Sequence, residues 1–295
     1  MPASIFYDPR MNVTGLSSLS PSASKPAALM ALLKERNRYD VVHGVYPVAP
    51  VTIGQLKLVH DTDYVDGVFA GRILNGFECI DSRVPEACLW TVGSLVGAVR
   101  HAAEHPVHPT LSPSSGFHHA HFGEGGGFCT FNGLAVAAAL YLQDHPDHRV
   151  GILDCDVHYG DGTADILRRL PFLADRVVHH TSGRYFHEDA ERLEFFAWLQ
   201  QSIAAINEAD CDVVIYQAGA DMHKDDPLGG FLDDDDMALR DRMVFRGIRA
   251  GIAWNLAGGY RTLAGDCTPV LNTHHRTYGE ANASVAQREQ LRSST

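Results

Sequence analysis

The stretch "ILDCDVHYGDGT", residues 152–163, ends a short apolar run in a series of polar side chains. Asp154, Asp156 and His158 stand at alternate positions, and Asp161 follows in a glycine-flanked turn. Alternate side chains of a strand project to the same side, so these three are expected to face one way. Burying carboxylates without partners is costly and is tolerated mainly where they are hydrogen-bonded or hold a metal. The stretch therefore predicts a buried strand that leads into a polar site.

Strand-like and helix-like segments alternate along the chain. The predicted strands are 149–157, 176–180 and 211–221, with further strands near 108–112 and at "GIAWN" (251–255). The predicted helices are 89–104, 132–145 and 193–209. This alternation is typical of a parallel sheet with helices on both faces, in which ligands bind beyond the carboxyl ends of the strands. We expect one α/β domain over residues 1–295.

The composition of the 295 residues is that of a globular protein, with 45% hydrophobic and 20% charged residues. The net charge of −12 and the lack of a basic cluster argue against direct nucleic-acid binding. No apolar run is long enough for a membrane span, and the N-terminus does not resemble a signal peptide. The six cysteines form no CxxC pair, which predicts free thiols and a cytoplasmic location. The 17 histidines direct attention to metal or acid–base chemistry.

A metal site is the first hypothesis for the polar residues. Asp156 and His158, together with Asp221 from a second predicted strand, form a set of two carboxylates and one imidazole. Three protein ligands with one open position are the arrangement of a catalytic divalent metal rather than a structural one. Zinc fits this set, and iron(II) shares the same ligand types. The alternative is that these groups are ordinary hydrogen-bonded residues at strand ends.

Five segments occur in the order and approximate spacing found in histone deacetylases, and the chain resembles that family. They are "SGFHHA" (115–120), "GFCTFNGLAVAA" (127–138), "ILDCDVHYGDGT" (152–163), "QAGADMHKDDPLGG" (217–230) and "LAGGY" (256–260). The family also includes bacterial acetylpolyamine amidohydrolases and acetoin-utilisation proteins. The resemblance implies the arginase–deacetylase α/β fold, with a parallel sheet of about eight strands. It also implies metal-dependent removal of acetyl or related acyl groups from lysine side chains or other amines.

The resemblance assigns acid–base roles to a tandem pair of histidines. His119 matches the principal general base and acid of the family, and His118 matches its neighbour, which assists electrostatically. Asp154 would orient His118, and Asp161 would orient His119. Carboxylates in such positions fix the histidine tautomer and raise its basicity.

The metal ligands and one tyrosine are implied in the same way. Asp156, His158 and Asp221 match the family's metal ligands, in agreement with the argument from strand geometry. Tyr260 matches the tyrosine that hydrogen-bonds the substrate carbonyl. Some branches of the family carry histidine there and deacetylate poorly, so Tyr260 predicts a competent hydrolase.

Substrate-binding residues follow from looser matches. Gly127 and Phe128 would form one wall of a narrow tube for an alkyl amine chain, and Tyr185 or Phe186 the other, with Phe186 slightly preferred. Aromatic walls suit an apolar chain whose amide must reach a deep metal. Glu78 is a candidate for the acidic residue at the rim.

The chain departs from the family pattern at three places. Tyr159 replaces the second histidine that many relatives carry after the metal ligand. The segment 187–220 is shorter than usual, and we expect the pocket to be more open on that side, or closed by another chain. The family often holds a potassium ion near the ligand-bearing strand, and "VVHHTSG" (177–183) differs from the usual sequence on one side of that ion.

Two other readings of the sequence stay open. One is an arginase- or agmatinase-like hydrolase with two manganese ions, although "DVHYGDG" lacks the usual spacing of bridging carboxylates. The other is a non-catalytic protein that binds acylated ligands on the same fold. The sequence does not decide the acyl-amine substrate, the physiological metal or the oligomeric state.

Overall fold

Seven parallel strands form one sheet in the computed structural model, which describes residues 3–16, 18, 20–36, 44–187, 190–262 and 266–293. The strands are β1 (Ser4–Phe6), β2 (Val45–Tyr46), β3 (Thr110–Leu111), β4 (Val150–Asp154), β5 (Val177–Thr181), β6 (Val213–Gln217) and β7 (Gly251–Asn255). Their order across the sheet is β2-β1-β3-β7-β6-β4-β5, and each neighbouring pair is parallel. The predicted parallel α/β architecture is confirmed.

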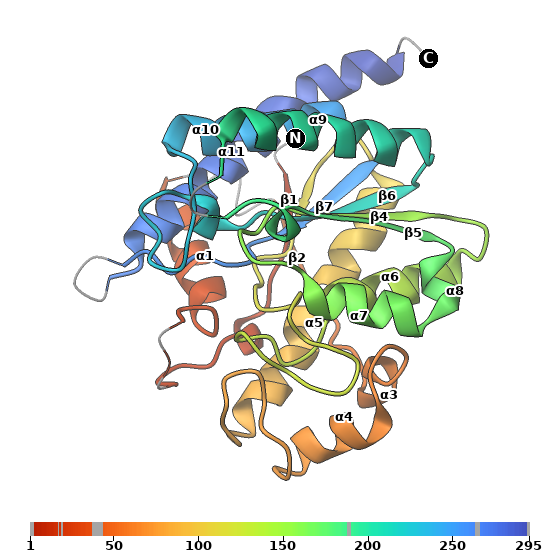
Figure 1. Ribbon diagram of the computed structural model, residues 1–295, viewed down its shortest axis with the longest axis vertical. Coiled ribbons are helices and arrows are strands. Elements are labelled where there is room, and N and C mark those ends of the chain that lie inside the picture. The colour runs from red at the N-terminus through yellow and green to blue at the C-terminus, as the bar shows by residue number, and fades with distance from the viewer. Residues whose placement is uncertain are drawn as a thin grey trace.

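Helices cover both faces of the sheet (Figure 1). The helices on one face are α1 (Lys25–Arg36), α9 (Arg192–Glu208), α10 (Asp234–Gly247) and α11 (Thr268–Ser293). Those on the other face are α3 (Ile53–Leu56), α4 (Thr62–Phe69), α5 (Arg83–Glu104), α6 (Gly133–Asp144), α7 (Asp161–Arg169) and α8 (Pro171–Ala174). The short 3-10 helices are η1 (Pro9–Met11), η2 (Ser182–Arg184) and η3 (Ala220–Met222). Within the described ranges, no helix has both the length and the apolar character needed to cross a bilayer.

The two faces of the sheet pack into two separate hydrophobic cores. In β6, Val213 and Ile215 belong to the core formed with α5 and α6, whereas Val214 and Tyr216 belong to the core formed with α9 and α10. All four side chains are fully buried. A strand buried on both faces needs apolar residues at every position, which explains the continuous apolar runs in the sequence.

The strands that lead to the polar residues end earlier than the sequence predicted. β4 ends at Asp154 and β6 ends at Gln217, so Asp156 and His158 lie in a loop and Asp221 lies on η3. The two loops approach closely at Gly219, where a Cβ atom would lie 2.7 Å from the Cα of Asp156. The expected polar residues therefore converge through loop packing and not through the regular alternation of one strand.

The expectation of about eight strands is also corrected, because the described residues form seven. After β5 the chain passes through η2 to helix α9 and then directly to β6. Apart from the undescribed residues 188 and 189, the short segment 187–220 thus holds helix α9 and strand β6 and no strand between them. Among the residues that the structure describes, β5 is therefore the edge strand on its side of the sheet.

Candidate active site

The candidate site lies at the carboxyl ends of three neighbouring strands, where parallel sheets bind their ligands. Asp154, Gln217 and Asn255 are the last residues of β4, β6 and β7, and they stand in register across the sheet. The Nε2 atom of Gln217 donates to Oδ1 of Asp154 at 3.2 Å. The Nδ2 atom of Asn255 in turn donates to the Oε1 atom of Gln217 at 3.2 Å. A buried row of polar residues therefore forms the floor below the site.

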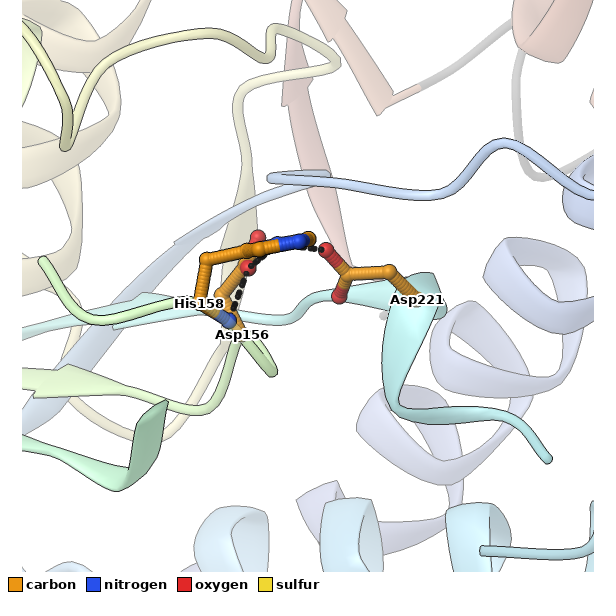
Figure 2. A group of neighbouring side chains, drawn as sticks. All are labelled: Asp156, His158 and Asp221. Carbon is orange, nitrogen blue, oxygen red and sulfur yellow. Dashed lines mark hydrogen bonds and ion pairs between the residues drawn. The ribbon is translucent and has the colours of Figure 1, made fainter. Parts of the chain in front are cut away.

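The three expected metal ligands lie close together (Figure 2). The Nδ1 atom of His158 is 3.0 Å from Oδ1 of Asp156 and 3.2 Å from Oδ2 of Asp221. Three ligand atoms about 2.1 Å from a tetrahedral ion would lie roughly 3.4 Å apart. The donor set, its spacing and the burial of both aspartates therefore fit a single divalent cation.

The electrostatics of the cluster also favour a bound cation. Burial opposes a charge on His158, but hydrogen bonds to Asp156 and Asp221 prevail and raise its pKa to about 11. Burial and the adjacent Asp156 charge raise the pKa of Asp221. Two carboxylates held this close in a buried site require positive charge between them. A divalent cation would meet that requirement.

His118 is held by the carboxylate at the end of β4. Its Nδ1 atom is 2.8 Å from Oδ2 of Asp154, and its Nε2 atom is 3.8 Å from Oδ2 of Asp156. Burial disfavours the imidazolium, but the charges of Asp154 and Asp156 outweigh burial and raise the pKa of His118 to about 9. This histidine is therefore a source of positive charge beside the expected ligands.

His119 forms a second pair with Asp161, the first residue of α7. Its Nδ1 atom is 2.8 Å from Oδ1 of Asp161, which leaves Nε2 as the unprotonated nitrogen of the ring. Burial and the neighbouring His118 lower the pKa of His119. Gly127 is needed here, because a Cβ atom at its φ of +52° would lie 2.6 Å from Cδ2 of His119. The ring is thus neutral and closely held, as a general base requires.

Tyr260 reaches the same place from the loop after β7. Its ring centroid is 6.4 Å from that of His158 and 5.7 Å from that of Phe128. Burial and the nearby carboxylates of Asp156 and Asp221 raise the pKa of Tyr260, so the phenol stays protonated. The side chain is therefore a hydrogen-bond donor at neutral pH.

The residues expected to bind substrate divide into two groups. Gly127 and Phe128 line a pocket with His118 and Tyr260, so the structure brings these four together. Phe186 lies elsewhere: it is 8% exposed and packs against the aromatic rings of α9, in the core. The preference for Phe186 over its neighbour therefore has no support in the fold.

The other two candidates lie at the surface. Tyr185 is 60% exposed. Glu78 is exposed in a turn at a φ of +57°, next to Phe77, whose ring centroid lies 5.8 Å from that of Phe128. Their roles as tube wall and rim acid stay predictions.

Ser182 and Gly183, from the segment expected on one side of a potassium ion, lie against the backbone of Asp156 and His158. The Ser182 hydroxyl donates to the Asp156 carbonyl at 2.8 Å, and Gly183 packs against the backbone of His158. The potassium ion itself stays a prediction.

Sequence reasoning missed one charged residue at the site, Lys25. Its side chain is buried, lines the same pocket as Tyr260, and donates from Nζ to the carbonyl of Ala257 at 2.9 Å. Burial lowers the pKa of Lys25 to about 8, although nearby aspartates oppose the shift. No local pattern marks this lysine, because its neighbours form a serine-rich turn. Gln217 could have been found by the logic used for Asp154, as a polar residue at the end of a buried strand.

The parallel sheet with helices on both faces matches the arginase–deacetylase α/β fold. The histone deacetylase domain model matches residues 21–187, which is more than half of the chain. The chain therefore belongs to the histone deacetylase domain family. The acetylpolyamine aminohydrolase of Burkholderia pseudomallei superposes with a TM-score of 0.75 over 96% of this chain and 99% of that one, at 16% identity. The HDA15 HD domain gives a TM-score of 0.70 over 100% and 99% of the two chains, at 19% identity.

Curated relatives are similar over part of their length. The acetoin utilization protein AcuC of Bacillus subtilis is 30% identical over 238 residues, which cover 67% of this chain and 60% of the relative. Acetylpolyamine amidohydrolase 2 of Pseudomonas aeruginosa is 28% identical over 167 residues, or 48% of each chain. The chain thus spans less than two thirds of the length of either relative.

Proposed function

We propose that the protein is a zinc-dependent amidohydrolase that removes acetyl or related acyl groups from lysine side chains or other amines. The observation that carries the proposal is the convergence of one three-ligand cluster, two histidine–aspartate pairs and one tyrosine in a single place. Asp156, His158 and Asp221 would hold the zinc ion. When bound there, zinc supplies Lewis acidity and lowers the pKa of a coordinated water.

The histidine pairs divide the proton chemistry. His119, neutral and fixed through Nδ1 by Asp161, would take the proton of the attacking water at Nε2 and later give a proton to the departing amine. His118, held by Asp154 and favoured in its charged form, would stabilise the negative charge that develops on the carbonyl oxygen. The unequal pKa shifts of the two rings support this division of roles.

Tyr260 would donate its phenolic hydrogen to the same oxygen. Its raised pKa keeps the proton on the phenol, and the aromatic ring of Phe128 stands beside it as one wall for the substrate chain. Removing one such donor typically costs about 100- to 1,000-fold in turnover. Tyr260 is therefore the residue whose loss separates hydrolysis from simple ligand binding.

Zinc reconstitution followed by turnover on a substrate panel tests the proposal. The panel contains an acetyl-lysine peptide, a trifluoroacetyl-lysine peptide, acetylputrescine and acetylspermidine. We expect turnover of at least one substrate, dependence on added metal, and a collapse in Tyr260→Phe. The matched control is Tyr46→Phe, which removes the same hydroxyl from an exposed residue of β2.

The outcomes distinguish the alternatives. One zinc per chain with Tyr260-dependent turnover supports the deacetylase. Two metal ions per chain would favour an arginase-like binuclear hydrolase, for which Tyr260 has no role. One bound metal without turnover of any substrate would indicate a protein that binds acylated ligands.

Two broader expectations belong to the same proposal. The continuous sheet supports a single catalytic domain over residues 1–295. All six cysteines are free thiols, which supports a reducing, cytoplasmic environment.

A further inference from the structure

One buried carboxylate outside the expected catalytic set is directed at the backbone of Tyr260. Asp226 is 6% exposed and lies in the loop between η3 and α10. Its Oδ2 atom accepts from the backbone N–H groups of Tyr260 at 2.7 Å and Arg261 at 3.0 Å. Its Oδ1 atom accepts from the backbone N–H of Leu228 at 3.1 Å. The carboxylate thus joins two loops that are far apart in the sequence.

A second contact fastens the same two loops. The guanidinium of Arg261 is 2.9 Å from Nδ1 of His223 and 3.4 Å from a carboxylate oxygen of Asp225. It also donates to the carbonyl of Pro269 at 3.3 Å. Arg261, the residue after Tyr260, is therefore tied to the loop that follows Asp221 through its side chain as well as through its backbone N–H.

The two glycines directly before Tyr260 restrict the backbone little by themselves, although the Gly258 N–H donates to Oδ2 of Asp156 at 2.8 Å. β7 ends at Asn255, and the residues just before the tyrosine are Gly258 and Gly259, the latter at a φ of +135°. Glycine backbone has more freedom than that of other residues. A donor that stabilises a transition state must be held in place before the reaction, since reorientation during the reaction would cost part of the stabilisation.

We propose that Asp226 is a positioning residue for Tyr260. Its carboxylate accepts hydrogen bonds from the backbone N–H groups of Tyr260 and Arg261. It thereby fixes the phenol over the cluster of Asp156, His158 and Asp221. The inference rests on the proposed function, because it assigns Asp226 a part in the same reaction. Asp226 follows Asp221 by five residues, so η3 and the loop directly after it carry both an expected metal ligand and the support of the donor.

A double-mutant cycle tests the proposal on the zinc-reconstituted full chain. Asp226→Ala should lower kcat by about 10- to 100-fold, as expected when a catalytic group is misplaced by about 1 Å. KM and zinc content should change by less than about twofold. In the Tyr260→Phe background the same change should cost less than about twofold in kcat, because the group it positions is already gone.

Two further variants make the test specific. Asp226→Asn keeps the size of the side chain and one carbonyl oxygen, so it should recover part of the lost kcat. If Asp226→Ala does not fold, Asp226→Asn takes its place in the double-mutant cycle with Tyr260→Phe. The matched control is Asp235→Ala, which removes an exposed carboxylate of α10 that lies outside the contacts between these two loops. It should leave kcat within about twofold of wild type.

Equal losses of kcat in the two backgrounds would overturn the proposal and assign Asp226 to general stability. Loss of zinc in parallel with kcat would also overturn it, because the effect would then act through Asp221. A wild-type chain without turnover, or with turnover insensitive to Tyr260→Phe, would overturn the proposed function together with this inference.

Discussion

Replacing Gly258 by alanine should strongly weaken zinc binding while leaving the fold intact. A Cβ atom at this position would lie 1.9 Å from Oδ2 of Asp221 and 2.7 Å from Oδ2 of Asp156. Real Cβ contacts essentially never fall below 3.0 Å, so the Asp221 carboxylate must move by about 1.1 Å. Ligand positions in a metal site tolerate only about 0.2 Å. We expect zinc affinity to fall by at least about 100-fold, the upper end of the cost of losing a supporting partner.

The assay is zinc content after dialysis against a series of zinc buffers, with Tm recorded for each sample without metal. The matched control is Gly123→Ala, because a Cβ atom at Gly123 meets no other atom within 4 Å. Wild-type zinc affinity in Gly258→Ala would refute the assignment of Asp221 as a ligand. A large loss of Tm without metal would refute the claim that the change acts only on the site.

Three other perturbations have defined outcomes. His119→Ala should lower turnover by about 100- to 10,000-fold without loss of zinc, the range for removal of a general base; retention of turnover in metal-loaded protein would contradict that role. His60 is buried, with Nδ1 bound to the His121 carbonyl and Nε2 accepting from the Asn132 N–H, and burial lowers its pKa to about 4. The unfolded chain protonates this imidazole near pH 6.5, whereas the folded chain does so only near pH 4. The free energy of unfolding should therefore fall by about 2 kcal/mol from pH 7 to pH 5. His60→Gln should lack that component in urea titrations at the two pH values. Gly279→Ala, at an exposed and unobstructed position inside α11, should raise the unfolding free energy by about 0.5–1 kcal/mol; a lower Tm would mean that the helix is constrained there in another way.

Local sequence patterns were sufficient to predict the strands that are buried on both faces of the sheet. The apolar run of β6 and the polar residues that follow it predicted a central strand leading to a site, because burial on each face of a sheet requires an apolar side chain at each position. The same reasoning overestimated strand length. Hydrogen bonding with neighbouring strands, and not the run of residues itself, decided that β4 ends at Asp154.

The sequence by itself determined the fold class, the group of Asp156, His158 and Asp221 as a candidate metal set, and the pairings that the family resemblance implied. The tertiary structure alone decided which neighbour of a pair is buried: Phe186 lies in the core, whereas Tyr185 is exposed. It alone also brought Lys25 to the pocket and Asp226 to the backbone of Tyr260. The physical reason is that periodicity records only which side of an element is buried. Contacts between residues 34 or 232 positions apart depend on where the loops close over the sheet.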